Sequence, residues 1–144
     1  MNDRQEPEPW SALITEARIL ALHKRALAEH GGLPGGPQTG CVSAKLGGAW
    51  AAEGYVGGEA GIEGLTFATY LAFYLAKGHC FNDANKRVAW LAVVDVLAVL
   101  GLRVDAAQKD AADFVERVAS LEGADARPEI VREWVTARLA EVET

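Results

Sequence analysis

Cysteine is scarce in this chain, and long apolar runs are absent. The 144 residues include two cysteines, Cys41 and Cys80, which do not make the disulfide framework of a small secreted domain. The start shows no basic segment followed by an apolar one, as a signal peptide would, so we expect a cytoplasmic location. The longest apolar run, Val88–Leu102, is interrupted by Asp95 and falls short of the roughly 20 residues that span a bilayer. It predicts a buried helix and no membrane partner.

The chain also lacks an excess of positive charge. Its 14 lysines and arginines against 20 aspartates and glutamates leave a net charge of -6, which disfavours a sequence-independent nucleic-acid binder with a basic face. We expect no direct nucleic-acid binding, although a local cluster of cations would suffice to bind a nucleotide. Half of the residues are apolar and 24% are charged, as in a soluble globular domain.

Helical periodicity recurs along the chain and predicts an all-α fold of about six helices. Residues 1–9 are polar and hold two of the five prolines, so we expect a disordered tail before a single helical domain over residues 10–144. The Gly-rich stretch Glu53–Gly64 argues against regular helix and holds no P-loop pattern. The first expected helix runs from a cap at Ser11 to the Gly31–Gly32 pair, and the next three run over Val42–Ala52, from Leu65 to Lys77, and from Asn82 or Asp83 to Leu100. A fifth helix should follow a capping box of Asp105 and Gln108. The sixth should begin at Pro128 and carry an apolar stripe of Val131, Val135, Leu139 and Val142.

The segment from Gly78 to Arg87 concentrates polar side chains between two apolar helices. It holds a histidine, a carboxylate, two amides, a lysine and an arginine. Lys86 and Arg87 would lie in the first turn of the second helix, where a cation is disfavoured by roughly 0.3–1 kcal/mol. That conflict disappears if an anion occupies the helix start, because the first backbone N–H groups there have no helical acceptor. The segment therefore predicts an anion site.

The individual residue types fit a nucleotide phosphate. Arg87 can donate two hydrogen bonds to phosphate oxygens, and Lys86 adds a compact charge. Asp83 is a hard oxygen ligand suited to holding Mg²⁺ together with phosphates, and the amide of Asn85 can orient a phosphate oxygen. His79 is suited to taking a proton from an attacking hydroxyl. The segment thus supplies the positioning and charge neutralisation that phosphoryl or nucleotidyl transfer requires.

The run His79-Cys80-Phe81-Asn82-Asp83-Ala84-Asn85-Lys86-Arg87 resembles the Fic signature, H-x-F-x-[D/E]-[G/A]-N-[G/K]-R. Ala84 and Lys86 resemble the Doc (death on curing) branch of the family, and His23 followed by Gly31–Gly32 resembles the family's opening helix and turn. The resemblance implies a Fic/Doc-like helical domain whose central buried helix follows the signature. It implies that Phe81 anchors the loop. The implied site has His79, Lys86 and Arg87 as catalytic residues, Phe81, Asn82, Asn85, Lys86 and Arg87 as the nucleotide-binding set, and Asp83 as the Mg²⁺ ligand.

The same resemblance implies a function. Doc-like proteins with lysine at the position of Lys86 transfer the terminal phosphate of ATP, and their known type of target is elongation factor Tu, so that translation stops. The chain would then be the toxin of a toxin–antitoxin pair. The self-inhibitory pattern [S/T]-x-x-x-E-[G/N] of other Fic proteins does not occur, which implies a separate Phd-like antitoxin. AMP transfer of the Fic type, or a catalytically silent binding protein, remain the alternatives.

Three further residues or segments have more than one interpretation. Doc-type proteins often carry Gly-x-Arg-Asp after the glycine turn, whereas this chain has Gly35-Gly36-Pro37-Gln38, and whatever the Arg–Asp pair contributes must be absent or replaced. We interpret His23 as a structural residue rather than a catalytic one. Asp95, within an apolar helix, is expected at a polar edge or a hydrogen-bonded core position.

Overall fold

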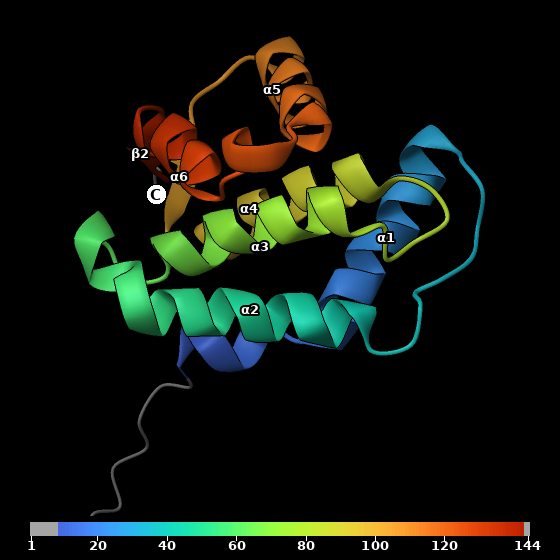
Figure 1. Cartoon of the computed structure of the whole chain (residues 1–144), viewed down its shortest axis with the longest axis horizontal. Coiled ribbons are helices and arrows are strands. Elements are labelled where there is room, and N and C mark those ends of the chain that lie inside the picture. Colours follow the sequence, from blue (N-terminus) through green and yellow to red (C-terminus); the bar gives the residue numbers. More distant parts are fainter. Residues whose placement is uncertain (1–8, 143–144) are drawn as a thin grey trace, which may run out of the picture.

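Six α-helices make up most of the computed structural model, which describes residues 9–142 (Figure 1). The predicted helical fold is confirmed, and a two-stranded antiparallel sheet is added to it. The disordered tail expected for residues 1–9 lies almost wholly outside the described residues. In chain order the elements are η1 (Trp10–Leu13), α1 (Glu16–His30), α2 (Cys41–Val56), η2 (Gly57–Ala60), α3 (Leu65–Gly78), α4 (Asn85–Val99), β1 (Leu102–Val104), α5 (Gln108–Ser120), η3 (Gly123–Asp125), α6 (Glu129–Thr136) and β2 (Leu139–Glu141).

Helix α3 lies at the centre of the fold. It packs against α2 on one side and against α4, α5 and α6 on the others (Figure 1), and most of its side chains are buried. Helix α4, the buried helix expected after the signature, packs one face on α3 through residues such as Val88 and Val96. The signature therefore connects two helices of a single hydrophobic core. No helix within residues 9–142 has the length and apolar character needed to cross a membrane.

Glu53 of α2 stabilises the start of α3. Its carboxylate accepts hydrogen bonds from the backbone N–H of Gly64, at 3.1 Å, and of Phe67, at 2.8 Å. Gly64 carries no capping side chain of its own, so a residue eleven positions earlier satisfies two N–H groups at this helix end. The expectation that Glu53–Gly64 is non-helical was wrong for its first part. Helix α2 continues to Val56, which holds Glu53 in the position where it caps α3.

Two expected helix starts differ from the structure. Ser11 lies in η1, and α1 begins after Thr15, whose Oγ1 accepts a hydrogen bond from the backbone N–H of Arg18 at 3.2 Å. Asp105 does not cap α5, whose N-cap is Ala107; its backbone N–H bonds to the Arg138 carbonyl at 2.7 Å and ties Asp105 to the C-terminal segment. The first difference exchanges one local cap for another, and the second accompanies a contact from elsewhere in the fold.

The last expected helix also ends early. Val131 and Val135 are buried on α6 as predicted. Leu139, the next member of the apolar stripe, lies instead in β2 and pairs with Val104 of β1. The backbone N–H of Val142 bonds to the Gly101 carbonyl at 2.9 Å. The short β1 segment after α4 thus offers backbone partners that draw the chain out of helix.

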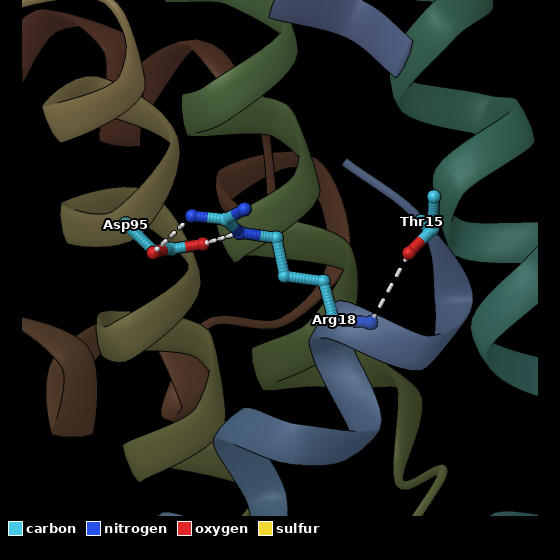
Figure 2. Close-up of polar contacts among 3 residues, drawn as sticks. All are labelled: Thr15, Arg18 and Asp95. Carbon is cyan, nitrogen blue, oxygen red and sulfur yellow. Dashed lines mark hydrogen bonds and ion pairs between the residues drawn. The ribbon is translucent and has the colours of Figure 1, made fainter. Parts of the chain in front are cut away.

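An ion pair joins α1 to α4 (Figure 2). Arg18 Nη2 lies 3.0 Å from Asp95 Oδ1, and Arg18 Nε donates to the other carboxylate oxygen. The two side chains are 35% and 23% exposed, so the pair is partly shielded from water. Asp95 is thus a hydrogen-bonded residue at the edge of the core, as we expected.

Replacing Asp95 with alanine should lower the free energy of unfolding by about 1–3 kcal/mol, because Arg18 then loses the partner of a partly buried charge. Chemical denaturation at neutral pH measures the change. Asp113→Ala is the matched control, since Asp113 pairs with Lys109 on α5 with side chains 63% and 84% exposed. Its loss should change stability by less than about 0.5 kcal/mol. Equal effects of the two substitutions would contradict a stabilising role for the Arg18–Asp95 pair.

Candidate functional site

The signature loop, residues 79–84, connects α3 to α4 in an irregular conformation. His79, at the end of α3, and Ala84, at the start of α4, have φ angles of 50° and 69°. Non-glycine residues avoid this left-handed region unless their surroundings enforce it, and such residues cluster at functional sites. The expectation that α4 begins at Asn82 or Asp83 was wrong, because Ala84 is the N-cap and no side chain caps the helix.

Asp83 does not cap α4 because its carboxylate has other partners. Oδ1 accepts the N–H of Ala84 at 2.8 Å, and Oδ2 accepts the N–H of Leu33 at 3.0 Å. These two backbone hydrogen bonds, and secondarily the positive charge of Arg87, hold the pKa of Asp83 below its usual value. Asp83 is therefore anionic at neutral pH, with lone pairs remaining on both oxygens for a cation.

Phe81 and Asn85 fasten the middle of the signature loop. The Asn85 side chain accepts the Phe81 N–H at 3.1 Å and donates to the Phe81 carbonyl at 2.9 Å. The Phe81 ring is buried and stacks on the His23 ring with centroids 3.9 Å apart. His23 Nε2 lies 3.2 Å from the Asp83 carbonyl oxygen. Phe81 thus anchors the loop and His23 supports it, which agrees with the structural interpretation of His23.

The glycine-rich segment 31–40, here called the glycine loop, lies along the signature loop. Asn82 donates its N–H to the Gly35 carbonyl at 3.2 Å, and Gln38 donates its N–H to the Cys80 carbonyl at 2.9 Å. Asn82 Nδ2 also donates to the Pro34 carbonyl at 3.2 Å. The Arg-Asp pair that the resemblance led us to look for is absent from this loop, where Gly35-Gly36-Pro37-Gln38 stands instead, and Gln38 supplies contacts between the two loops.

Cys41 and Cys80 form a disulfide, with Cα atoms 5.5 Å apart. Two cysteines led us to expect no disulfide framework, and this single disulfide was not predicted. Cys80 lies in the signature loop and Cys41 is the first residue of α2, 39 positions earlier. Their proximity depends on the packing of the glycine loop against the signature loop, which no local pattern in the sequence predicts.

Close packing of the two loops requires glycine at position 36. Gly36 has a φ of 89°, and a Cβ there would lie 2.9 Å from both the Cys80 carbonyl oxygen and the Phe81 Cα. Gly36→Ala should therefore displace the signature loop and lower the free energy of unfolding by about 1–3 kcal/mol. Gly47→Ala is the control: its Cβ would meet no atom within 4 Å on α2, so it should be neutral or stabilise by up to about 1 kcal/mol. Thermal unfolding compares the two, and a neutral Gly36→Ala would contradict this packing.

A cavity of about 350 Å³ opens at the start of α4. It brings together six of the seven predicted site residues and leaves out Phe81, whose contact with a nucleotide stays a prediction. Ala119 of α5 also lines the cavity, and Lys77 holds that end of α5 by donating to the Ala119 carbonyl at 3.0 Å. The polar lining residues are His79, Asn82, Asp83, Asn85, Lys86 and Arg87.

Two cations lie beside this cavity. Arg87 Nη1 donates to the carbonyl of Gly31, the C-cap of α1, at 3.0 Å. Lys86 Nζ lies 2.7 Å from Glu116 Oε2, and both of these side chains are exposed. Sequence reasoning missed Glu116, because it is one of several charged residues on the polar face of α5 and nothing local marks it. An exposed pair of this kind contributes little to stability, so Lys86 can exchange Glu116 for another anion.

The start of α4 suits an anion. Val88 makes the first helical hydrogen bond, to the Ala84 carbonyl. The N–H groups of Asn85, Lys86 and Arg87 therefore precede it without helical acceptors, and no capping side chain covers them. Asn85, Lys86 and Arg87 all line the cavity, and so does Asp83. This donor set fits a phosphate group, and the Asp83 carboxylate would hold a divalent cation that accompanies the phosphate.

The metal would need ligands beyond the protein. Within residues 9–142 no group of three or more histidine, cysteine, aspartate or glutamate side chains could hold a metal ion, and Asp83 is the acidic residue among those that line the cavity. Mg²⁺ typically binds through one or two carboxylates, substrate phosphates and water. The single carboxylate therefore fits Mg²⁺ that arrives with a nucleotide.

Comparison with known proteins shows to which family this chain belongs. The model of the Fic/DOC family matches residues 13–97, which is more than half of the chain and includes the whole signature. The chain belongs to the Fic/DOC family. The matched region runs from η1 into α4, so α5 and Glu116 lie beyond it. The residue that α5 contributes to the cavity lining, Ala119, therefore lies outside the part of the chain that the family model matches.

Protein kinase doc of Escherichia phage P1 is a relative of this Fic/DOC chain. The two are 38% identical over 81 residues, which cover 53% of this chain and 58% of the relative. The match thus spans less than two thirds of the relative's length. It confirms the resemblance to the Doc branch that Ala84 and Lys86 indicated.

Proposed function

We propose that this Fic/DOC chain transfers the terminal phosphate of ATP to a protein hydroxyl. The observation that supports the proposal most strongly is one cavity at the start of α4 lined by His79, Asp83 and Arg87. The family membership supports transferase chemistry, and the similarity to a protein named as a kinase supports phosphate as the transferred group.

In this proposal the start of α4 binds the phosphates of ATP. Arg87 donates hydrogen bonds to phosphate oxygens, and the N–H groups of the first turn add further donors. Lys86 leaves Glu116 and neutralises developing negative charge. Asn85 maintains the loop through Phe81 and has one amide hydrogen left for a phosphate oxygen, and Asn82 borders the same cavity. Mg²⁺, held by Asp83, would neutralise the phosphates and fix their orientation.

His79 would act on the acceptor hydroxyl. It is exposed and lines the cavity, so an incoming protein segment can reach it. As the hydroxyl oxygen bonds to the terminal phosphorus, His79 takes the hydroxyl proton, the bond to the bridging oxygen breaks, and ADP leaves with the electron pair. Transfer of AMP would use the same residues on the α-phosphate. The side chain of Lys86, in place of the glycine of most Fic enzymes, favours the terminal phosphate.

The proposed biological role follows from the Doc branch. The acceptor would be elongation factor Tu, whose modification would arrest translation, and the chain would act as a cytoplasmic toxin. A Phd-like antitoxin would be the partner that restrains it. This part of the proposal rests on the family resemblance rather than on a contact within the chain.

Transfer from differently labelled ATP tests the proposal. The chain is incubated with Mg²⁺, elongation factor Tu and ATP labelled at either the γ- or the α-phosphate. Label from the γ-phosphate alone is expected, and chelation with EDTA should abolish it. Label from the α-phosphate would instead establish AMP transfer. Absence of label from both, with purified elongation factor Tu and with a bacterial protein extract as acceptor, would favour a silent binding protein.

A further inference from the structure

The Cys41–Cys80 disulfide has no part in the proposed transfer chemistry, yet it cross-links the signature loop next to His79. Cys80 stands between His79 and Phe81 and is 1% exposed. Cys41 is partly exposed and begins α2, a helix of 16 residues. The disulfide therefore joins the first residue of α2 to the signature loop, which carries the proposed proton acceptor, His79.

We propose that Cys41 and Cys80 are a thiol–disulfide exchange site for low-molecular-weight thiols, and that the oxidised pair fixes His79 in its working position. The inference rests on the proposed function for what His79 does. The position of His79 relative to the rest of the cavity is then set by the redox state of a cysteine pair outside the transfer chemistry.

The His79 end of the signature loop has few other constraints. Gln38 Nε2 reaches the His79 carbonyl at 3.4 Å, and Gln38 N–H reaches the Cys80 carbonyl at 2.9 Å. His79 itself has a positive φ, a conformation that a non-glycine residue keeps only where its surroundings enforce it. The disulfide on the next residue is the covalent part of those surroundings.

The other end of the loop is held independently of the disulfide. Asn85 bonds both the N–H and the carbonyl of Phe81, and the Phe81 ring stacks on His23. Asp83 is bonded to Leu33 and Ala84. Reduction should therefore loosen His79 and leave the Asp83–Arg87 region in place. Proton transfer would weaken, whereas nucleotide binding would persist.

The exchange reaction balances with two thiols. A thiolate R–S⁻ attacks Sγ of Cys41, the more exposed partner, and the S–S bond breaks with its electron pair going to Cys80 Sγ, which takes up a proton. A second thiolate attacks the R sulfur of the mixed disulfide, and Cys41 Sγ leaves and is protonated. The cysteine pair gains two electrons and two protons, and two R–SH are oxidised to R–S–S–R.

A glutathione redox titration of the full chain tests the inference. The protein is equilibrated at several ratios of reduced to oxidised glutathione, and alkylation with mass spectrometry measures the disulfide fraction. The transfer rate should follow that fraction and fall roughly 10- to 100-fold on full reduction, the effect of a misplaced catalytic group. The dissociation constant for ATP with Mg²⁺ should change by less than about 3-fold, because the phosphate contacts remain.

Amide hydrogen exchange without ATP gives a readout that does not depend on transfer. Reduction should speed exchange at residues 35–41 and 78–81, with little change in α4. Equal exchange in both forms would overturn the inference. Faster exchange throughout α3 and α4 would show that the disulfide stabilises the fold as a whole, and would overturn the inference as well. If neither form transfers phosphate, the proposed function fails, and the exchange pattern still decides the role of the disulfide.

The Cys41→Ala substitution removes the disulfide and leaves every residue of the signature unchanged. This variant should behave like the reduced protein at every glutathione ratio. Ser43→Ala, at an exposed position two residues later in α2, is the matched control and should respond to glutathione as the unmodified chain does. A Cys41→Ala variant with the full rate of the oxidised protein would contradict the role assigned to the pair.

Discussion

Replacing His79 with alanine is expected to lower the rate of phosphate transfer by about 10²–10⁴-fold. A positioned general base contributes an effect of this size, and His79 is the histidine that lines the cavity at the start of α4. The phosphate contacts of Arg87 and of the α4 N–H groups do not involve His79. The dissociation constant for ATP should therefore stay within about 3-fold of the original value. Steady-state transfer assays and calorimetric titration with ATP measure the two quantities separately.

A second substitution at position 79 distinguishes the loss of the general base from a loss of activity caused by a changed loop structure. His79 has a left-handed backbone conformation, which asparagine tolerates better than alanine does. His79→Asn should therefore keep the loop geometry and still lose the transfer rate. His30→Ala is the matched control, because His30 lies exposed at the end of α1 and should keep full activity. Transfer by His79→Asn at more than about a tenth of the original rate would rule out His79 as the general base.

Replacing Arg87 with alanine should weaken the binding of ATP by about 10- to 150-fold. The loss corresponds to roughly 1.5–3 kcal/mol, the contribution of hydrogen bonds between a guanidinium and a charged acceptor. Arg87→Lys should recover part of the affinity, because lysine keeps the charge but cannot fork two bonds onto one phosphate. Calorimetric titration in the presence of Mg²⁺ measures all three dissociation constants.

The control for this substitution is Arg103→Ala. Arg103 lies exposed on β1, near Asp105, and does not line the cavity. The variant should bind ATP with unchanged affinity. Because Arg87 also bonds the Gly31 carbonyl, thermal unfolding of each variant shows whether a change in affinity follows from a change in fold. Unchanged ATP binding in a folded Arg87→Ala variant would remove Arg87 from the phosphate site.

The site could be predicted from sequence largely because its residues are contiguous. His79 to Arg87 span one loop and one helix turn, so a local pattern places them side by side. The unfavourable position of Lys86 and Arg87 at a helix start predicts an anion site without any knowledge of the fold. The structure brings six predicted residues to one cavity, whereas their individual roles stay predictions.

What the sequence did not predict depends on partners far along the chain. Asp83 looks like a helix cap, but Leu33, fifty residues earlier, supplies a backbone N–H that competes for its carboxylate. The Cys41–Cys80 pair forms only once the glycine loop has packed on the signature loop. Leu139 continues an apolar stripe, yet it pairs with Val104 of β1 instead of extending helix α6. In each case a tertiary contact overrides a correct local preference.

The central claim is that the start of α4 binds nucleotide phosphate. A crystal structure of the chain with Mg²⁺ and a non-hydrolysable ATP analogue tests it most directly. We expect the phosphates in the cavity between His79 and Arg87, with phosphate oxygens within hydrogen-bonding distance of the Arg87 guanidinium and of the first N–H groups of α4, and with the metal on Asp83. A nucleotide bound elsewhere, with the Arg87 guanidinium turned to solvent, would contradict the claim.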